Sequence, residues 1–210
     1  MLFTQALLGV AFVSTAAMAF VLPEGLADGS YIAYINSSGH EVHELFSPSL
    51  AARLAASSDA ASARPRAAPP IVNSRGTSVN PHSRRAIQSY WELWCGCGFN
   101  LNHANTDKAV QGIKKQCAAY AGNNACTMAH DNAWYTISND VVAFLCYGGS
   151  TTVSRITTAF SKITEKCGLY IAGSALFEEG LWYELVHGYM RYSSGLDFCA
   201  NSISSSANHC

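Results

Sequence analysis

The sequence predicts a disulfide-stabilised α+β fold in which two amphipathic helices are attached to a common sheet. Apolar residues between positions 153 and 167 recur at spacings of three and four, and this stripe ends at Cys167. A second stripe between positions 110 and 117 ends at Cys117. A cysteine on the buried face of a helix is placed to join that helix to the sheet beneath it. Runs rich in Tyr, Trp, Leu and Val lie between the two stripes and after the stripe at 153–167, as expected for strands.

The predicted elements follow one another as strand, helix, strand, strand, helix, strand, strand. The aromatic first strand holds Cys95 and Cys97, whose alternation places both sulfurs on the same side. Each helix precedes a pair of strands, which suggests an internal duplication. The expected ranges are 91–99, 105–122, 134–138, 141–147, 150–167, 169–177 and 181–192.

Local signals mark the ends of these elements. Asn105, Thr106 and Asp107 supply capping side chains at the start of the first helix. Gly168 suits the left-handed position after the second helix, and Lys166 lies in its last turn, where the helix dipole favours positive charge. The Ser- and Asn-rich tail at 200–209 would fray but for Cys199 and the terminal Cys210.

The two halves of the chain differ in composition. All eight cysteines and four tryptophans lie between Trp91 and Cys210, whereas all six prolines lie at or before Pro81. An apolar run at 7–17, followed by the small residues up to Ala19, is typical of a secretory signal, so we assign residues 1–19 to one. No later segment offers the roughly 20 apolar residues of a membrane span. We therefore expect a secreted, extracellular protein without a transmembrane segment.

Residues 20–85 have the features of a propeptide. Segments 31–35 and 40–46 flank a turn at 36–39 and predict a small hairpin, which alone could pack only weakly. Asn36 begins a glycosylation sequon in that turn. Residues 47–82 are rich in Ala, Ser, Arg and Pro and are too poor in large apolar groups to order. Arg84 and Arg85 form a dibasic site where a kexin-type protease would cut, leaving a mature domain of residues 86–210.

An even number of cysteines in a secreted chain indicates disulfides. Eight cysteines predict four bridges, and 105 connectivities are formally possible. A metal or redox role for Cys95-Gly96-Cys97 is disfavoured because no second Cys/His pair has suitable spacing. The expected disulfide residues are Cys95, Cys97, Cys117, Cys126, Cys146, Cys167, Cys199 and Cys210.

Charge gives little support for an anionic partner. The whole chain has a formal net charge of −1. The expected mature domain carries seven basic and nine acidic residues. Nucleic-acid and membrane-surface binding both depend on clustered Lys and Arg, so neither nucleic acid nor an anionic membrane is an expected partner.

An acid–base enzyme is a weaker hypothesis, and we predict no catalytic residue, cofactor or metal ligand. Glu184 and His187 would lie on opposite faces of a strand, so only a long-range contact could assemble a site. The motif from His40 to His43 has the wrong spacing for a zinc protease. The residue types of a secreted ribonuclease are supplied by His103, His130, His187, His209, Glu178, Glu179, Glu184 and Arg191.

Aromatic residues offer a third hypothesis, a surface that stacks on sugars. Alternation along strands sends about half of such residues inward, so most are expected in the core. The candidates are Trp91, Trp94, Trp134, Tyr135, Trp182, Tyr183, Tyr189 and Tyr192.

The second half of the chain resembles the smut-fungus killer toxin family, the secreted calcium-channel-blocking toxins and related fungal effectors. The resemblance covers roughly residues 95–195. The matching features are the segment 113–117 with Cys126 following, the strand at 138–144, the helix at 156–163 leading to Cys167-Gly168, and the strand at 180–190.

The resemblance implies an antiparallel sheet with two helices packed on one face, stapled by disulfides. It also implies a secreted toxin or effector without cofactor that acts from outside on a cell-surface or membrane-protein target such as a calcium channel. We expect the protein to be a monomer. Two features depart from the family. The Cys-x-x-Cys-Gly motif of the family corresponds to residues 164–168 of this chain, which contain only one cysteine. The basic residue with which the family blocks channels has no counterpart, because no Lys or Arg occurs at 127–154. No active residue is therefore carried over.

The leading hypothesis is a secreted killer-toxin-like protein or effector. A small secreted ribonuclease or other hydrolase is the first alternative, and it requires His130 or His187 to lie with a glutamate in a cleft. A cell-wall or glycan-binding module is the second, and burial of every tryptophan would remove it.

Overall fold

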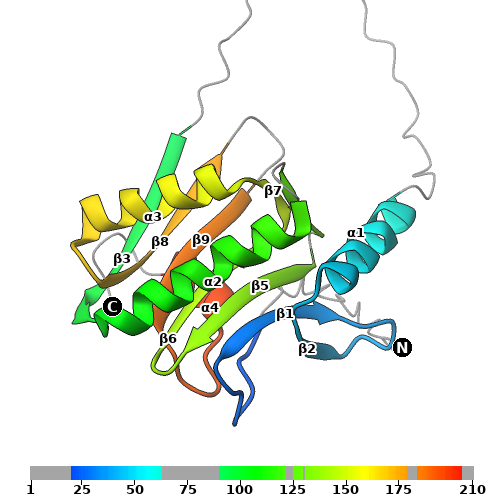
Figure 1. The fold of residues 1–210 in the computed structure, drawn as a ribbon, viewed down its shortest axis with the longest axis horizontal. Helices are drawn as coiled ribbons and strands as arrows, with labels where there is room; N and C mark the ends of the chain where they lie inside the picture. The colour runs from blue at the N-terminus through cyan, green and yellow to red at the C-terminus, as the bar shows by residue number, and fades with distance from the viewer. Residues whose placement is uncertain (1–19, 63–89, 122–124, 130, 179–183, 205–210) are drawn as a thin grey trace, which may run out of the picture.

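The central feature of the computed structural model is a seven-stranded antiparallel sheet (Figure 1). The structure describes residues 20–62, 90–121, 125–129, 131–178 and 184–204. Every neighbouring pair in the order β2-β1-β5-β6-β9-β8-β3 is antiparallel. The strands are β1 (Gly29–Ile35), β2 (Glu41–Leu45), β3 (Tyr90–Asn100), β5 (Asn132–Ser138), β6 (Val141–Cys146), β8 (Ile171–Glu178) and β9 (Glu184–Arg191).

Two long helices cover one face of this sheet, as predicted (Figure 1). They are α2 (His103–Ala121), which packs on β5 and β6, and α3 (Val153–Cys167), which packs on β8, β3 and β9. Their apolar stripes meet Trp134, Leu145 and Tyr189 from the sheet in one core cluster. The α+β class and its stabilisation by disulfides, both expected from the sequence, are confirmed.

The opposite face is also covered, which the sequence did not predict. A short helix, α4 (Phe198–Ser204), packs there against β8 and β9. Its Phe198 joins Phe20, Leu22 and Tyr135 in a second core cluster. The tail, which was expected to fray but for its cysteines, is helical as far as Ser204. Cys199 is bonded to Cys146, Phe198 is buried, and Asp197 accepts a hydrogen bond from the Ala200 amide at 2.9 Å.

Helix α3 follows its sequence pattern closely. Ile156, Ala159, Phe160 and Ile163 are buried, whereas Val153 at the first position is 37% exposed. The Thr152 side chain accepts a hydrogen bond from the Arg155 amide at 3.1 Å. Gly168, with φ of 104°, ends the helix.

Helix α2 begins earlier than its predicted caps. Asn102 is the capping residue, because its side chain accepts a hydrogen bond from the Asn105 amide at 3.1 Å. Thr106 is buried and donates to the Asn102 carbonyl, so it lies inside the first turn. Further along, a Cβ on Gly112 would lie 2.3 Å from Cγ2 of Thr136. The glycine thus lets α2 approach β5 closely.

The N-terminal segment is part of the main sheet. The predicted hairpin exists as β1 and β2, and Asn36 accepts turn hydrogen bonds from the Ser38 and His40 amides. The hairpin, which alone could pack only weakly, does not stand alone, because β1 lies between β2 and β5. Residues 47–82 were predicted to lack ordered structure. This was wrong for the part that forms α1 (Pro48–Ser62), whose Leu50 and Ala51 belong to the first core cluster. The processing residues Ala19, Arg84 and Arg85 lie outside the described residues.

Among the described residues, three disulfides connect separate elements. Cys95–Cys167 joins β3 to α3, as the stripe of α3 predicts. Cys117–Cys126 joins α2 to β4 (Cys126–Met128), which pairs with β7 (Gly149–Thr151) in a small second sheet that the sequence did not predict. Cys146–Cys199 joins β6 to α4. The side chain of Cys97 and all of Cys210 lie outside the described part of the structure.

The predicted repetition of a helix followed by two strands is visible in the sheet. Helix α2 precedes the β5–β6 hairpin and α3 precedes the β8–β9 hairpin. The second strands of the two hairpins, β6 and β9, pair antiparallel in the middle. The order β5-β6-β9-β8 therefore reads as two helix-hairpin units placed back to back.

We expect the loss of stability on removing a disulfide to follow the length of the loop it closes. Cys146–Cys199 and Cys117–Cys126 both have fully buried sulfurs but span 53 and 9 residues. Loop-closure entropy predicts a loss of about 4 kcal/mol for the double alanine variant of the first pair and about 2.5 kcal/mol for that of the second. Urea unfolding of both variants beside the parent measures the difference, and an equal or larger loss at Cys117–Cys126 would contradict the loop argument.

Candidate functional site

An open groove lies on the surface of the molecule between the two long helices. It has a volume of about 380 Å³ and lies between α2 and α3, above β9. Its lining residues are Thr106, Asp107, Val110, Lys114, Thr157, Phe160, Ser161, Thr164, Glu165, Leu169, Tyr170 and Tyr189. We call this feature the α2–α3 groove.

The groove has an apolar floor and polar walls. Phe160 and Tyr189 are buried at its base, with ring centroids 5.7 Å apart. Burial raises the pKa of the Tyr189 phenol, so the group stays neutral and able to donate a hydrogen bond. The walls carry the carboxylates of Asp107 and Glu165, the ammonium of Lys114 and several hydroxyls. Such a lining suits a ligand with both apolar and hydrogen-bonding surface.

One end of the groove holds an aromatic pair in a fixed position. The Tyr170 ring stacks on His103 at 3.9 Å between centroids and 13° between planes. Its hydroxyl donates to Asp107 Oδ2 at 3.3 Å, and its carbonyl accepts from the Leu101 amide. Tyr170 has φ of 59°, a left-handed conformation that the turn after α3 imposes. Beside it, Leu169 is 64% exposed.

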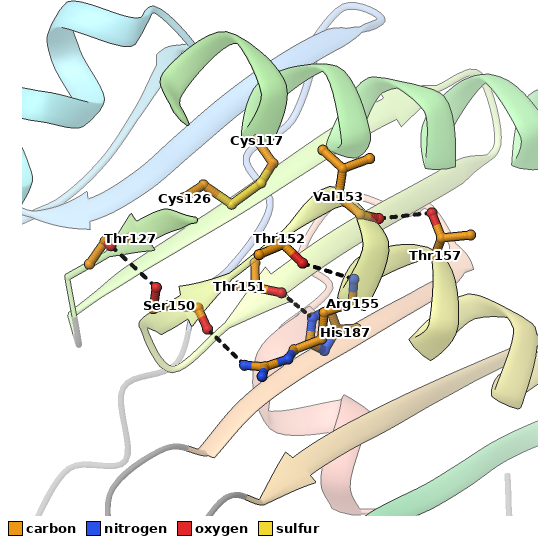
Figure 2. The surroundings of a disulfide bond; sticks show 10 residues. All are labelled: Cys117, Cys126, Thr127, Ser150, Thr151, Thr152, Val153, Arg155, Thr157 and His187. Atoms are coloured by element: carbon orange, nitrogen blue, oxygen red, sulfur yellow. Dashed lines mark hydrogen bonds between the residues drawn. A yellow bond between two sulfur atoms is a disulfide. The ribbon is translucent and has the colours of Figure 1, made fainter. Parts of the chain in front are cut away.

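His187 is the other chemically notable side chain, and it is fully buried. Figure 2 shows it beside Thr151. Its Nε2 lies 3.2 Å from the Thr151 hydroxyl, whereas its Nδ1 has no partner at hydrogen-bonding geometry. Burial lowers the pKa of His187 to about 4. The Ala175 backbone acts to raise this pKa, and the positive charge of Arg155 lowers it further. The imidazole is therefore neutral at physiological pH.

A chain of contacts links the disulfide of α2 to this histidine (Figure 2). Cys117–Cys126 fixes β4, β4 pairs with β7, and Thr151 at the end of β7 meets His187. The next residues begin α3, where Arg155 places its guanidinium 4.4 Å from the Phe177 ring centroid and donates to the Ser150 carbonyl. This arrangement positions the start of α3.

The ribonuclease residues do not come together in the part of the chain that the structure describes. His187 is buried and contacts Thr151, whereas His103 is exposed and stacks on Tyr170. The positions of His130, His209 and Glu179, and the side chains of Glu178 and Glu184, are outside the described set. Among the described side chains, no group of three His, Cys, Asp or Glu could hold a metal ion.

The aromatic residues proposed for sugar stacking are mostly core residues, as expected. Trp134, Tyr135 and Tyr189 are buried. Trp91 and Trp94 are half-buried, and Trp91 packs on Phe177 at 4.8 Å between ring centroids. Trp182 and Tyr183 lie outside the description. Tyr189 nevertheless lines the floor of the groove, and Tyr170, which was not among the candidates, lies at one end of it.

A polar chain that the sequence did not suggest crosses from β2 to β5. Glu41 Oε1 lies 2.7 Å from His43 Nε2, and His43 Nδ1 lies 2.7 Å from the Tyr135 hydroxyl. Burial raises the pKa of Tyr135, which keeps its hydroxyl protonated. Glu41 and His43 share a strand face, but Tyr135 lies 92 residues away, so no local signal could have revealed the contact.

Comparison with known proteins gives no relative. No family model, curated protein or solved structure matches the chain. No helix among the described residues is long and apolar enough to cross a membrane.

We expect the burial of His187 to make the protein less stable in acid. Its pKa is about 4 in the folded state and about 6.5 when exposed, so the unfolded chain binds a proton that the folded chain excludes. Stability is full above about pH 6.5 and falls as the pH drops towards 4, by up to about 3 kcal/mol.

The matched variants are His187→Gln, which cannot titrate, and His103→Gln, which changes an exposed histidine. Urea unfolding at about pH 7 and about pH 4 measures the acid-induced loss. The loss should shrink in His187→Gln and persist in His103→Gln. An unchanged loss in His187→Gln would show that other groups cause the acid sensitivity.

Proposed function

We propose that this protein is a secreted, toxin-like or effector-like protein that acts from outside on a fungal or host cell. The observation that carries the proposal is the antiparallel sheet under two helices, with separate disulfides attaching α3, β4 and α4. Disulfides of this number persist in oxidising compartments, which agrees with the leader expected at residues 1–19. The resemblance to smut-fungus killer toxins suggests the same role.

The contact surface in this proposal is the α2–α3 groove. It combines a buried aromatic floor with exposed Leu169 and with charges of both signs, a mixture that suits a protein surface. Lys114 brings an ammonium to the groove from α2. The family's channel-blocking base would fall within 127–154, where this chain has no Lys or Arg. A calcium channel as the target thus rests on the resemblance alone.

A glycan is the second candidate ligand, and the stacked Tyr170–His103 pair favours it. Sugar rings pack their apolar faces on aromatic rings, while their hydroxyls bond to carboxylates and side-chain hydroxyls. Asp107 and Glu165 supply carboxylates along the same groove, and Thr157, Ser161 and Thr164 supply hydroxyls. A cell-wall oligosaccharide would therefore use the same surface as a protein target.

We expect purified protein to inhibit the growth of a subset of fungal or host cells. Because the proposed target class is a calcium channel, added calcium should restore growth of sensitive cells. Dose–response curves on a broad panel, with and without added calcium chloride, measure both effects. No inhibition of any cell type would contradict the toxin proposal, whereas inhibition without calcium rescue would exclude the channel as the target.

Two arginine variants of α3 test whether the groove is the contact surface. Ser161→Arg places a bulky cation in the groove, and Thr158→Arg places the same residue at an exposed position that does not line it. Both sites are solvent-facing, so neither change disturbs the core. We expect Ser161→Arg to weaken inhibition, or binding on a glycan array, by at least about tenfold, and Thr158→Arg to leave it unchanged. Equal activity of both variants would place the contact elsewhere.

A further inference from the structure

We infer that residues 20–62 stay bound to residues 90–204 as a non-covalent second chain when the connecting segment is cut. This segment was expected to be a detachable propeptide. The structure makes it one side of the fold, with contacts at the sheet edge and on both sheet faces (Figure 1). The inference stands apart from the proposed toxin role, since it concerns only how the molecule holds together.

The first contact is the ladder between β1 and β5. Six residue pairs run antiparallel from Gly29↔Ile137 to Tyr34↔Asn132. The side chains of β1 enter both cores: Ile32 is fully buried beneath the helices, and Tyr31 stacks on Tyr135 on the other face at 5.3 Å between centroids. Without β1, the β5 backbone would become an open sheet edge beside exposed core residues.

Buried polar groups on the other side of this interface depend on the segment. Gln116 on α2 is 2% exposed, and its amide donates to the Tyr31 carbonyl at 3.1 Å and more weakly to that of Tyr135. The Tyr135 hydroxyl meets His43, which Glu41 holds in turn. Loss of the segment would remove the Tyr31 carbonyl from Gln116 and the His43 imidazole from the Tyr135 hydroxyl, and losing the partner of a buried polar group is costly.

The beginning of the segment closes the face opposite the long helices. Phe20 and Leu22 pack in the same cluster as Phe198. The Leu22 amide donates to the Leu196 carbonyl at 3.0 Å, and the Gly195 amide donates to the Leu22 carbonyl at 2.8 Å. The segment therefore wraps from this face, through the sheet, to α1 on the helix side.

No covalent bond would hold the cut chains. Residues 20–85 contain no cysteine, so no disulfide can join them to the rest. Hydrolysis at a dibasic site such as Arg84-Arg85 adds water across one peptide bond and leaves a new carboxylate and a new amine. The association would then rest on the burial of apolar side chains and on hydrogen bonds alone.

The test uses the full chain with a specific protease recognition sequence replacing residues 76–83, which guarantees a cut in the connecting segment. After cleavage we expect two bands in non-reducing denaturing electrophoresis. We expect one particle containing both pieces in native mass spectrometry and gel filtration at about 1 μM protein. Separate elution of the N-terminal piece, whether the remainder stays soluble or precipitates, would overturn the inference.

Two glutamate variants on the hairpin refine the test. Ile32→Glu puts a carboxylate into the core and should weaken retention by at least about 100-fold. Leu45→Glu makes the same kind of change on β2 at a residue that is 66% exposed, and should leave retention intact. If Ile32→Glu does not fold, the retention of the N-terminal piece after cleavage of the parent chain is by itself the test of the inference. Full retention in a folded Ile32→Glu variant would also contradict this interface.

Discussion

Burial of both faces of β5 and β6 is the constraint on which the rest of the structure depends. Every residue of these two strands is buried. Because successive side chains point to opposite faces, such strands need a packed layer on each side. Helices α2 and α3 form one layer, and α4 with the first described residues forms the other. The disulfides attach α3 and α4 to this sheet and α2 to the smaller one.

The α2–α3 groove is a product of the same arrangement. Each helix buries one apolar stripe and turns its polar residues outward, so the channel between them has an aromatic floor and polar walls. The left-handed turn that ends α3 brings Tyr170 to one end of that channel. Because the buried stripes hold the helices on the sheet, substitutions of their outward-facing residues have little effect on stability. The groove is therefore the part of this fold most open to a specific binding role.

The sequence predicted elements whose signals are local. The stripe of α3, the glycine after it and the hairpin turn at Asn36 all appear at the expected places. What it missed depends on contacts between distant residues. The position of β1 beside β5, the burial of Leu50 on α1 and the pairing of β4 with β7 are set by partners that a periodicity pattern cannot reveal.

The candidate site was least predictable. Asp107 was interpreted as a helix cap and Tyr170 as part of a strand, and their contact joins residues 63 positions apart. His187 was placed correctly on a strand, but its enclosure depends on β7, which the sequence did not indicate. A binding surface built by two helices is visible only once their packing is known.

The neighbourhood of β1 and β5 also constrains the order in which the chain can fold. The β5–β6 hairpin closes through a two-residue turn, whereas Ser30 and Thr136, whose hydroxyls lie 2.9 Å apart, are separated by 106 residues. Local contacts form before distant ones because they close shorter loops. β1 can pair early with β2, but it is synthesised long before β5, so its ladder with β5 closes late. Until that ladder forms, β5 has one edge unpaired.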